Sequence, residues 1–310
     1  MPAAYAHMTL VNILREPRRL EVLSGFPRNA IPVLSRWQKF CELGAVSPDY
    51  PYLAFDDIQG KKWADIMHWI RVGEMIKAGI AYLRGESGEG REKGLAWLLG
   101  YCAHVTTDVT VHPVIELKVG PYVGHERPHR ICEMNQDVYI FRRLNLKVSL
   151  SEFLKSGIYR CADPADANKL DPDISRLWLL MMEKVHAAEF AGNVPDIHKW
   201  HRRFTTIVDN IAEESNRLVA FARHVATGVL GMMYPLENEI DFQYINNLHC
   251  PGGRTHSYDE VFDMALTNVG QVWAWVASGV LAGDATYESK ITNWNLDTGL
   301  DENRRSVFWS

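Results

Sequence analysis

The sequence predicts an all-α protein. Apolar residues recur at helical spacing through most of the 310-residue chain, alternating strand patterns are few, and no repeat or low-complexity linker interrupts the pattern. Hydrophobic residues make up 47% and charged residues 23% of the chain, which is typical of a globular protein with a substantial core. No composition shift marks a domain boundary, so we expect a single domain over residues 1–310.

Proline and glycine mark the ends of the expected helices. The first helical segment stops before Pro17, and a long amphipathic segment is closed by Gly85. Pro113 is expected to end the next helix, because the residue before a proline leaves the α region. Pro128 fits the first turn of the helix that follows. The expected helices cover residues 9–15, 63–83, 91–112, 128–144, 151–156, 173–190, 200–230 and 258–280.

Charge and cysteine content limit the function classes. The net charge of −5 and the lack of a basic stripe argue against a nucleic-acid groove, so no nucleic-acid partner is expected. The five cysteines are an odd number without a CxxC pair, which favours free thiols in a reducing compartment. No secretory signal pattern and no apolar stretch long enough to span a bilayer is found, so a transmembrane segment is not expected. We expect a cytoplasmic protein, free or peripheral to the inner membrane.

Two runs of imidazole and carboxylate side chains, spaced four residues apart, form the most informative motif. Side chains at this spacing stack on one face of a helix. The members are His104, Asp108 and His112 in the first run, and His125, His129, Glu133 and Asp137 in the second.

The first run lies in an apolar helix, where polar side chains must pair with each other or bind a ligand. Nitrogen and oxygen ligands without a thiolate suit catalytic zinc, iron or manganese. The pattern therefore favours a metal site between helices, and the alternative for His104 and Asp108 is a buried hydrogen-bonded pair. Three roles are left open for Asp137: a metal ligand, a hydrogen-bond partner of a ligating histidine, or a solvated residue.

Three upstream residues are weaker candidates when taken alone. His7 lies in an apolar N-terminal stretch and could be a surface or capping histidine. Asp49 lies between two prolines, where an Asx-turn is the ordinary interpretation. His68 lies within an expected helix, where a histidine is more often part of the core.

The whole pattern resembles the zinc-dependent phospholipase C family, whose relatives include the S1/P1-type nucleases. In that family, metal ligands come from a histidine near the mature N-terminus, a Pro-Asp turn, a helix histidine, a Gly-Tyr-x-x-His-x-x-x-Asp helix with a histidine after it, and a His-x-x-x-Glu helix. The matching residues here are His7, Asp49, His68, His104, Asp108, His112, His129 and Glu133. The resemblance covers about residues 5–140, and we expect the metal-binding core at about 5–145 and further helices over 146–310.

The resemblance implies two to three Zn²⁺ ions, with Asp49 as a ligand and as the general base. It also implies hydrolysis of a phospholipid at a membrane surface, releasing diacylglycerol and a phosphorylated head group. The family's N-terminal tryptophan ligand has no counterpart, since no tryptophan precedes Trp37. The spacing from Asp108 to His112 is also short, so His125 is a substitute or an additional ligand. A regulatory protein partner would fit an enzyme that can attack its own membrane.

Three other interpretations remain open from the sequence. A nuclease on the same metal scaffold is one. A di-iron carboxylate bundle is the second, because Glu126-x-x-His129 and Glu183-x-x-His186 have the required spacing. The third is a helical interaction module whose histidines are satisfied within the core.

Overall fold

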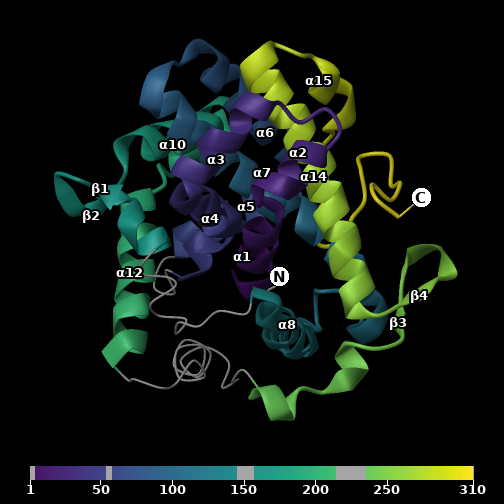
Figure 1. The fold of residues 1–310 in the computed structure, drawn as a ribbon. Coiled ribbons are helices and arrows are strands. Elements are labelled where there is room, and N and C mark those ends of the chain that lie inside the picture. The colour runs from purple at the N-terminus through teal and green to yellow at the C-terminus, as the bar shows by residue number, and fades with distance from the viewer. Residues whose placement is uncertain (1–3, 54–57, 145–156, 214–234, 310) are drawn as a thin grey trace.

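Helix α7 (Gly88–Val119) forms the centre of the molecule, and every residue from Gly94 to Ile115 is buried (Figure 1). The computed structural model describes residues 4–53, 58–144, 157–213 and 235–309. Helix α7 packs against α4 and α14 on two sides, and it also contacts α1, α8 and α10. The predicted all-α class is confirmed, and the apolar character of α7 is explained by this all-round burial.

The helices are α1 (Ala4–Leu14), α2 (Pro17–Val22), α3 (Ile31–Arg36), α4 (Gln38–Val46), α5 (Ile58–Trp69), α6 (Val72–Gly85), α7, α8 (Glu126–Phe141), α10 (Pro172–Val185), α11 (Ala187–Gly192), α12 (Ile197–Glu213), α14 (Tyr258–Ala282) and α15 (Thr286–Lys290). Short 3-10 turns include η2 (Ser47–Leu53) and η3 (Arg142–Leu144). The described strands form two antiparallel pairs, β1 (Ala162–Asp163) with β2 (Asp166–Leu170) and β3 (Leu248–His249) with β4 (Thr255–His256).

The prediction that Pro113 ends a helix is wrong, because α7 continues to Val119. A proline within a helix leaves the carbonyl four residues earlier without its usual donor. The C-terminal segment, residues 291–309, packs against this turn. A Cβ on Gly299 would lie 2.5 Å from Pro113 Cγ and 2.6 Å from the Val109 carbonyl oxygen. Tertiary packing thus supports the proline-containing turn, and His112 lies within the helix rather than at its end.

Two predicted helices are each divided in the structure. The segment 63–83 is split between α5 and α6 by Arg71, whose φ of 54° is left-handed. The segment 173–190 is split at His186 into α10 and α11. The predicted helix at 151–156 and the part of the 200–230 helix beyond Glu213 lie outside the described residues.

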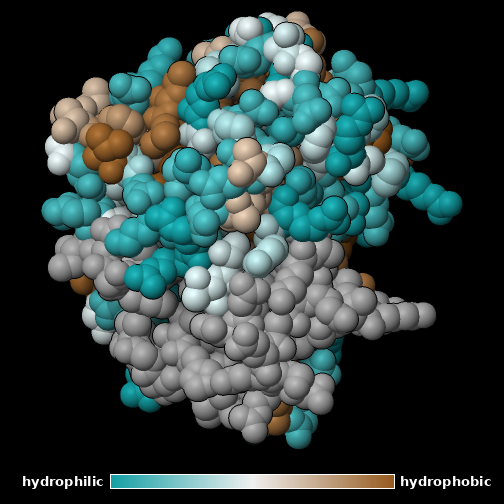
Figure 2. Space-filling view, turned by 90° about the vertical axis from the view of Figure 1, so that its left-hand side faces the viewer, coloured by the Kyte–Doolittle hydropathy of each residue, from teal (hydrophilic) through white to brown (hydrophobic). Residues whose placement is uncertain are grey.

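Three further features concern the polarity of the surface, the cysteines and the lengths of the described helices. Where Figure 2 is coloured by hydropathy, the surface is mostly hydrophilic, with apolar residues in smaller groups between the polar ones, as on most globular proteins. All five cysteines are buried and free. In the described ranges, no helix combines the length and the apolar character needed to cross a membrane.

Candidate metal centre

Backbone contact between α4 and α7 sets the position of the main motif. A Cβ on Gly44 would lie 2.0 Å from a carbonyl oxygen of α7, and a Cβ on Gly100 would lie 2.0 Å from a carbonyl oxygen of α4. Only glycine permits so close an approach. The approach brings the Ala45 carbonyl oxygen to 2.9 Å from His104 Nδ1. A carbonyl can only accept, so Nδ1 carries the proton and Nε2 points away from α4.

Four side chains from η2, α5 and α7 form what we call the central site. Asp49, His68 and His104 place their ligand atoms within 4.8 Å of one another. His68 Nε2 lies 3.4 Å from Asp49 Oδ1 and 3.5 Å from His104 Nε2. Asp108 Oδ2 lies 3.2 Å from His104 Nε2 and 3.9 Å from His68 Nε2. Two imidazoles and two carboxylates are a ligand set that suits zinc.

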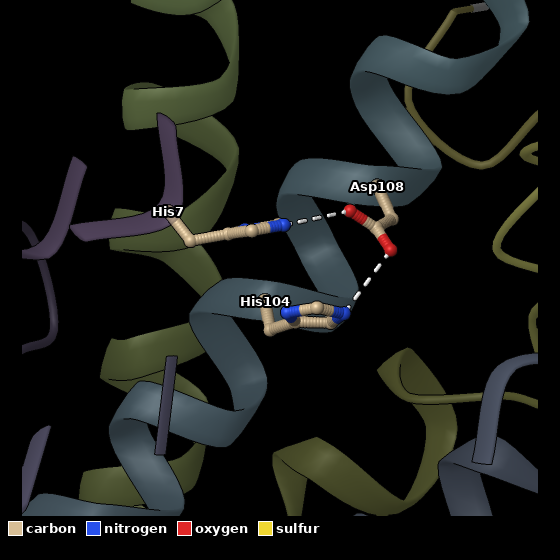
Figure 3. A group of neighbouring side chains, drawn as sticks. All are labelled: His7, His104 and Asp108. Carbon is tan, nitrogen blue, oxygen red and sulfur yellow. Dashed lines mark ion pairs between the residues drawn. The ribbon is translucent and has the colours of Figure 1, made fainter. Parts of the chain in front are cut away.

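The second oxygen of Asp108 faces a different histidine. His7 on α1 stacks on His104 with ring centroids 4.0 Å apart, and its Nε2 lies 3.2 Å from Asp108 Oδ1 (Figure 3). His7, His104 and Asp108 also lie within 4.8 Å of one another by their ligand atoms. An imidazole nitrogen has one lone pair and serves one ion, whereas a carboxylate has two oxygens. Asp108 thus offers one oxygen to each of two neighbouring groups of ligand atoms.

The distal nitrogens of three histidines are held by backbone carbonyls. His68 Nδ1 lies 2.7 Å from the Ala64 carbonyl, and His112 Nδ1 lies 2.8 Å from the Leu296 carbonyl. His104 has the matching contact with Ala45. Histidines that bind metals ordinarily donate their other ring N–H in this way, which fixes the tautomer. In all three, Nε2 is the nitrogen left to bind an ion.

Several buried polar atoms of this region have no well-oriented hydrogen bond. They are both ring nitrogens of His7, Asp49 Oδ1, both carboxylate oxygens of Asp108, and His112 Nε2. Buried polar groups are costly unless paired or bound to a ligand. These atoms fit a site for divalent cations, and their nitrogen and oxygen chemistry suits zinc.

Charge also favours a cation in the central site. Burial lowers the pKa of His104, but Asp108 and Asp49 outweigh it and raise that pKa to about 9. Burial raises the pKa of Asp108, but the surrounding histidines outweigh it and hold the pKa well below its usual value. The pKa of Asp49 is likewise lowered, because His104 and His68 outweigh its burial. The two carboxylates are thus ionised, and the described residues that pair with them are histidines.

Of the other four predicted ligands, one lies on α7, one directly precedes α8, and two lie in the first half of α8. Burial lowers the pKa of His112 well below its usual value, so its imidazole is neutral. His129 Nε2 lies 2.6 Å from the Gly120 carbonyl, and Glu133 lies 3.5 Å from Arg130. His125 precedes α8 and pairs its Nδ1 with the Pro121 carbonyl. We call His112, His129 and Glu133 the α7–α8 group.

The structure does not gather these four residues as tightly as the others. Within the described ranges, the triads with ligand atoms inside 4.8 Å come from His7, Asp49, His68, His104 and Asp108. The charge of His129 does act on His112, so the two helices place these histidines in the same neighbourhood. His112, His125, His129 and Glu133 as ligands therefore stay predictions.

Asp137 anchors the helix that carries His7. Its carboxylate accepts from the backbone N–H of Ala6 at 3.0 Å and of Tyr5 at 3.3 Å. These donors belong to the first turn of α1, where N–H groups lack intrahelical partners. Asp137 thus fixes the first turn of α1, directly before His7.

The C-terminal segment also contacts the helices that carry the predicted ligands, which the sequence does not indicate. Leu296 and Asp297 contact α5 and α7, and Trp69 Nε1 donates to Asp297 Oδ2 at 2.7 Å. Their sequence neighbourhood indicates only a turn, in which Asn295 Oδ1 accepts from the backbone N–H of Asp297 and Thr298. No ligand-like spacing marks Asp297, so the sequence held no signal for it.

The fold and site define a helical protein whose buried histidines and carboxylates are arranged to bind metal ions. A model of the zinc-dependent phospholipase C family matches residues 6–188. This match covers more than half of the chain, and the protein belongs to the zinc-dependent phospholipase C family. No curated protein and no solved structure gives a significant match.

Proposed function

We propose that the protein is a zinc-dependent phosphodiester hydrolase that cleaves a glycerophospholipid on the glycerol side of its phosphate. The products are diacylglycerol and a phosphorylated head group. The family match supports hydrolysis of the phospholipase C type. The observation that carries the proposal is Asp108, whose two oxygens face different histidines, each at 3.2 Å. Two to three Zn²⁺ ions are proposed, held by the central site, by His7 with Asp108, and by the α7–α8 group.

Zinc, when bound, supplies positive charge that polarises a phosphoryl group and makes water more acidic. The chain's own residues orient the ligand atoms and hold or accept protons next to them. His68 and His104 present Nε2 because backbone carbonyls hold their Nδ1–H. Asp108 stays ionised and would offer one oxygen to each of two ions.

Asp49 is the residue proposed as general base. Its side chain is 20% exposed, whereas those of His104 and Asp108 are fully buried, so it lies at the open edge of the central site. Its lowered pKa keeps the carboxylate ionised near neutral pH. An ionised carboxylate at this edge can accept a proton from an attacking water.

The proposed substrate is a phospholipid in a membrane surface, approached from outside the bilayer. The finding that no described helix can span a membrane fits this peripheral approach. The five free thiols support a reducing compartment, so we propose the cytoplasm as the location. A single domain over 1–310 is also proposed, and a regulatory protein partner remains an open proposal.

Product analysis tests the proposed reaction. Purified protein would be incubated with phosphatidylcholine vesicles and zinc, and both products identified by mass spectrometry and ³¹P NMR. We expect diacylglycerol and phosphocholine, with activity lost in His104→Ala and kept in the exposed-surface control Glu302→Gln. Cleavage of single-stranded DNA without cleavage of lipid would instead support the nuclease interpretation. Absence of both activities in the zinc-loaded protein would contradict the proposal.

A further inference from the structure

The C-terminal segment reaches the metal centre although it lies outside the family match, which ends at residue 188. The Leu296 N–H donates to the His68 carbonyl at 3.0 Å, and the Leu296 carbonyl accepts from His112 Nδ1 at 2.8 Å. The first contact is available because α5 ends at Trp69, which leaves the His68 carbonyl without an intrahelical donor. One residue thus joins two predicted ligands on different helices.

Asp297 adds a carboxylate next to the same imidazole. Its Oδ1 lies 3.7 Å from His112 Nδ1, while its Oδ2 accepts from Trp69 Nε1 at 2.7 Å. The side chain is 15% exposed, and the charges of His68 and Asp108 act on it. Asp297 therefore lies at the Nδ1 edge of His112, and the buried Nε2 without a hydrogen bond lies at the other edge.

Packing holds this segment firmly in place. Gly299 has a φ of 67° and lies against the turn of α7 that contains Pro113, where a Cβ would collide at 2.5 Å. Trp309 Nε1 donates to the Thr110 carbonyl of α7 at 2.8 Å. The contacts of Leu296 before Asp297, and of Gly299 and Trp309 after it, thus fix the position of Asp297 relative to His112 on α7.

We propose that Asp297 is a positioning residue of the metal centre, whose carboxylate lies beside the His112 Nδ1–H that the Leu296 carbonyl accepts and makes Nε2 a stronger zinc ligand. An acceptor for the distal N–H of a ligating histidine fixes its ring and raises its basicity, and a negative charge next to that N–H acts in the same direction. The inference rests on the proposed function, because it takes His112 to be a zinc ligand. It assigns a part of the site to residues beyond the family match.

Zinc affinities of matched variants test this role. The full chain and its variants Asp297→Ala, Asp297→Asn and His112→Ala would be titrated with zinc against a competing chelator. We expect Asp297→Ala to weaken one zinc equivalent by about 10–100-fold and leave the others unchanged. Asp297→Asn keeps an oxygen that can accept from Trp69. Its affinity for that zinc equivalent should lie between those of the alanine variant and the wild type. His112→Ala should lose the same equivalent outright.

Glu302→Gln is the control, because Glu302 lies in the same segment, is exposed and contacts Asn293 at 2.7 Å. It should bind zinc as the wild type does. Thermal melts of the zinc-free variants separate positioning from a purely structural role. Equal weakening of all zinc equivalents, or a lower melting temperature with unchanged affinities, would overturn the inference.

The outcome also separates this inference from the proposed function. If His112→Ala loses one equivalent and Asp297→Ala keeps wild-type affinity for every equivalent, the role of Asp297 is wrong and the zinc site stands. If the wild-type chain binds no zinc after reconstitution, the proposed function fails and the role of Asp297 fails with it.

Discussion

His104 Nε2 and Asp108 Oδ2 lie 3.2 Å apart in the buried interior of α7, with both side chains fully excluded from solvent. One helical turn separates the two residues, so the helix itself sets this contact. The partners of the pair come from elsewhere: Ala45 on α4 holds the other nitrogen of His104, and His7 on α1 faces the other oxygen of Asp108. The pair on α7 thus contacts residues of α1 and α4 at the place where the ions are proposed to bind.

Asp108→Asn should disable both adjacent metal positions. The amide keeps the shape of the side chain but removes the negative charge that would bridge two ions. We expect loss of zinc from the central site and from His7. In the zinc-free protein, the free energy of unfolding should fall by about 3 kcal/mol. This value is the low end for breaking a buried ion pair, because His104 can lose its proton and so avoid an unpaired buried charge.

Zinc content by mass spectrometry and urea unfolding would measure these two effects. Asp173→Asn is the control, since Asp173 pairs with Lys93 and is 34% exposed. Its loss should cost no more than about 1 kcal/mol. Full zinc content in Asp108→Asn would contradict the bridging role.

The pKa of His104 gives the zinc-free protein a defined pH dependence. The folded pKa of about 9 lies above the ordinary 6.5, so His104 binds its proton more tightly in the folded state. Its contribution to stability is therefore fully present below about 6.5 and is lost as the pH rises through about 9. Urea unfolding between pH 6 and 10 would measure this loss, and Asp108→Asn should reduce it. A wild-type stability that rises between pH 8 and 10 would contradict the assignment.

The same proton competes with zinc. Zinc needs a neutral imidazole, so binding below about pH 9 must displace the His104 proton. We expect apparent zinc affinity at the central site to rise with pH up to about 9 and then level off. Calorimetry at pH 7 in buffers with different ionisation heats would count the released protons. Zinc binding without proton release would show that His104 is not a ligand.

Gly100→Ala should separate α4 from α7. The added Cβ would lie 2.0 Å from a backbone carbonyl, so the helices must move apart and draw the Ala45 carbonyl away from His104. Overpacking of this kind costs about 1–3 kcal/mol or more. Zinc affinity at the central site should fall as well.

Gly85→Ala is the matched control, because Gly85 ends α6 with open space around it. That change should be neutral or stabilise the fold by about 0.4–1 kcal/mol, since it reduces the freedom of the unfolded chain. Thermal melts and chelator competition on both variants make the comparison. Equal stability of the two variants would mean that the helices do not depend on this contact.

Asp137→Ala should loosen the start of α1. Two N–H donors lose their acceptor, which typically costs about 0.5–2 kcal/mol at a helix N-terminus. His7 then loses its fixed position, so zinc bound between His7 and Asp108 should weaken more than zinc at the central site. Chelator competition would resolve the two equivalents, and unchanged binding of both would show that His7 does not need this anchor.

The sequence predicted those parts of the site that local geometry determines. The spacing of His104 and Asp108 places them on one helical face whatever surrounds them. His7, Asp49 and His68 carry no such spacing, and the family resemblance identified them. The structure places the ligand atoms of these five residues in two neighbouring triads.

Contacts between distant segments account for what the sequence could not predict. Pro113 indicates a helix end by its local preference, but Gly299 packs against it and the helix continues. Nothing in the sequence at Arg71 indicates the helix break between α5 and α6. The backbone of Arg71 is left-handed there, and Gly73 lies in tight contact with the Thr292 carbonyl. Asp297 lies far from every ligand in sequence. Such contacts depend on the complete fold.

The most direct test is a crystal structure of the zinc-loaded chain with anomalous data collected at the zinc absorption edge. We expect one peak about 2.0–2.1 Å from Nε2 of His68 and His104, and a second peak between His7 and Asp108. Zinc found only at surface histidines, with the central site empty at saturating zinc, would contradict the central claim.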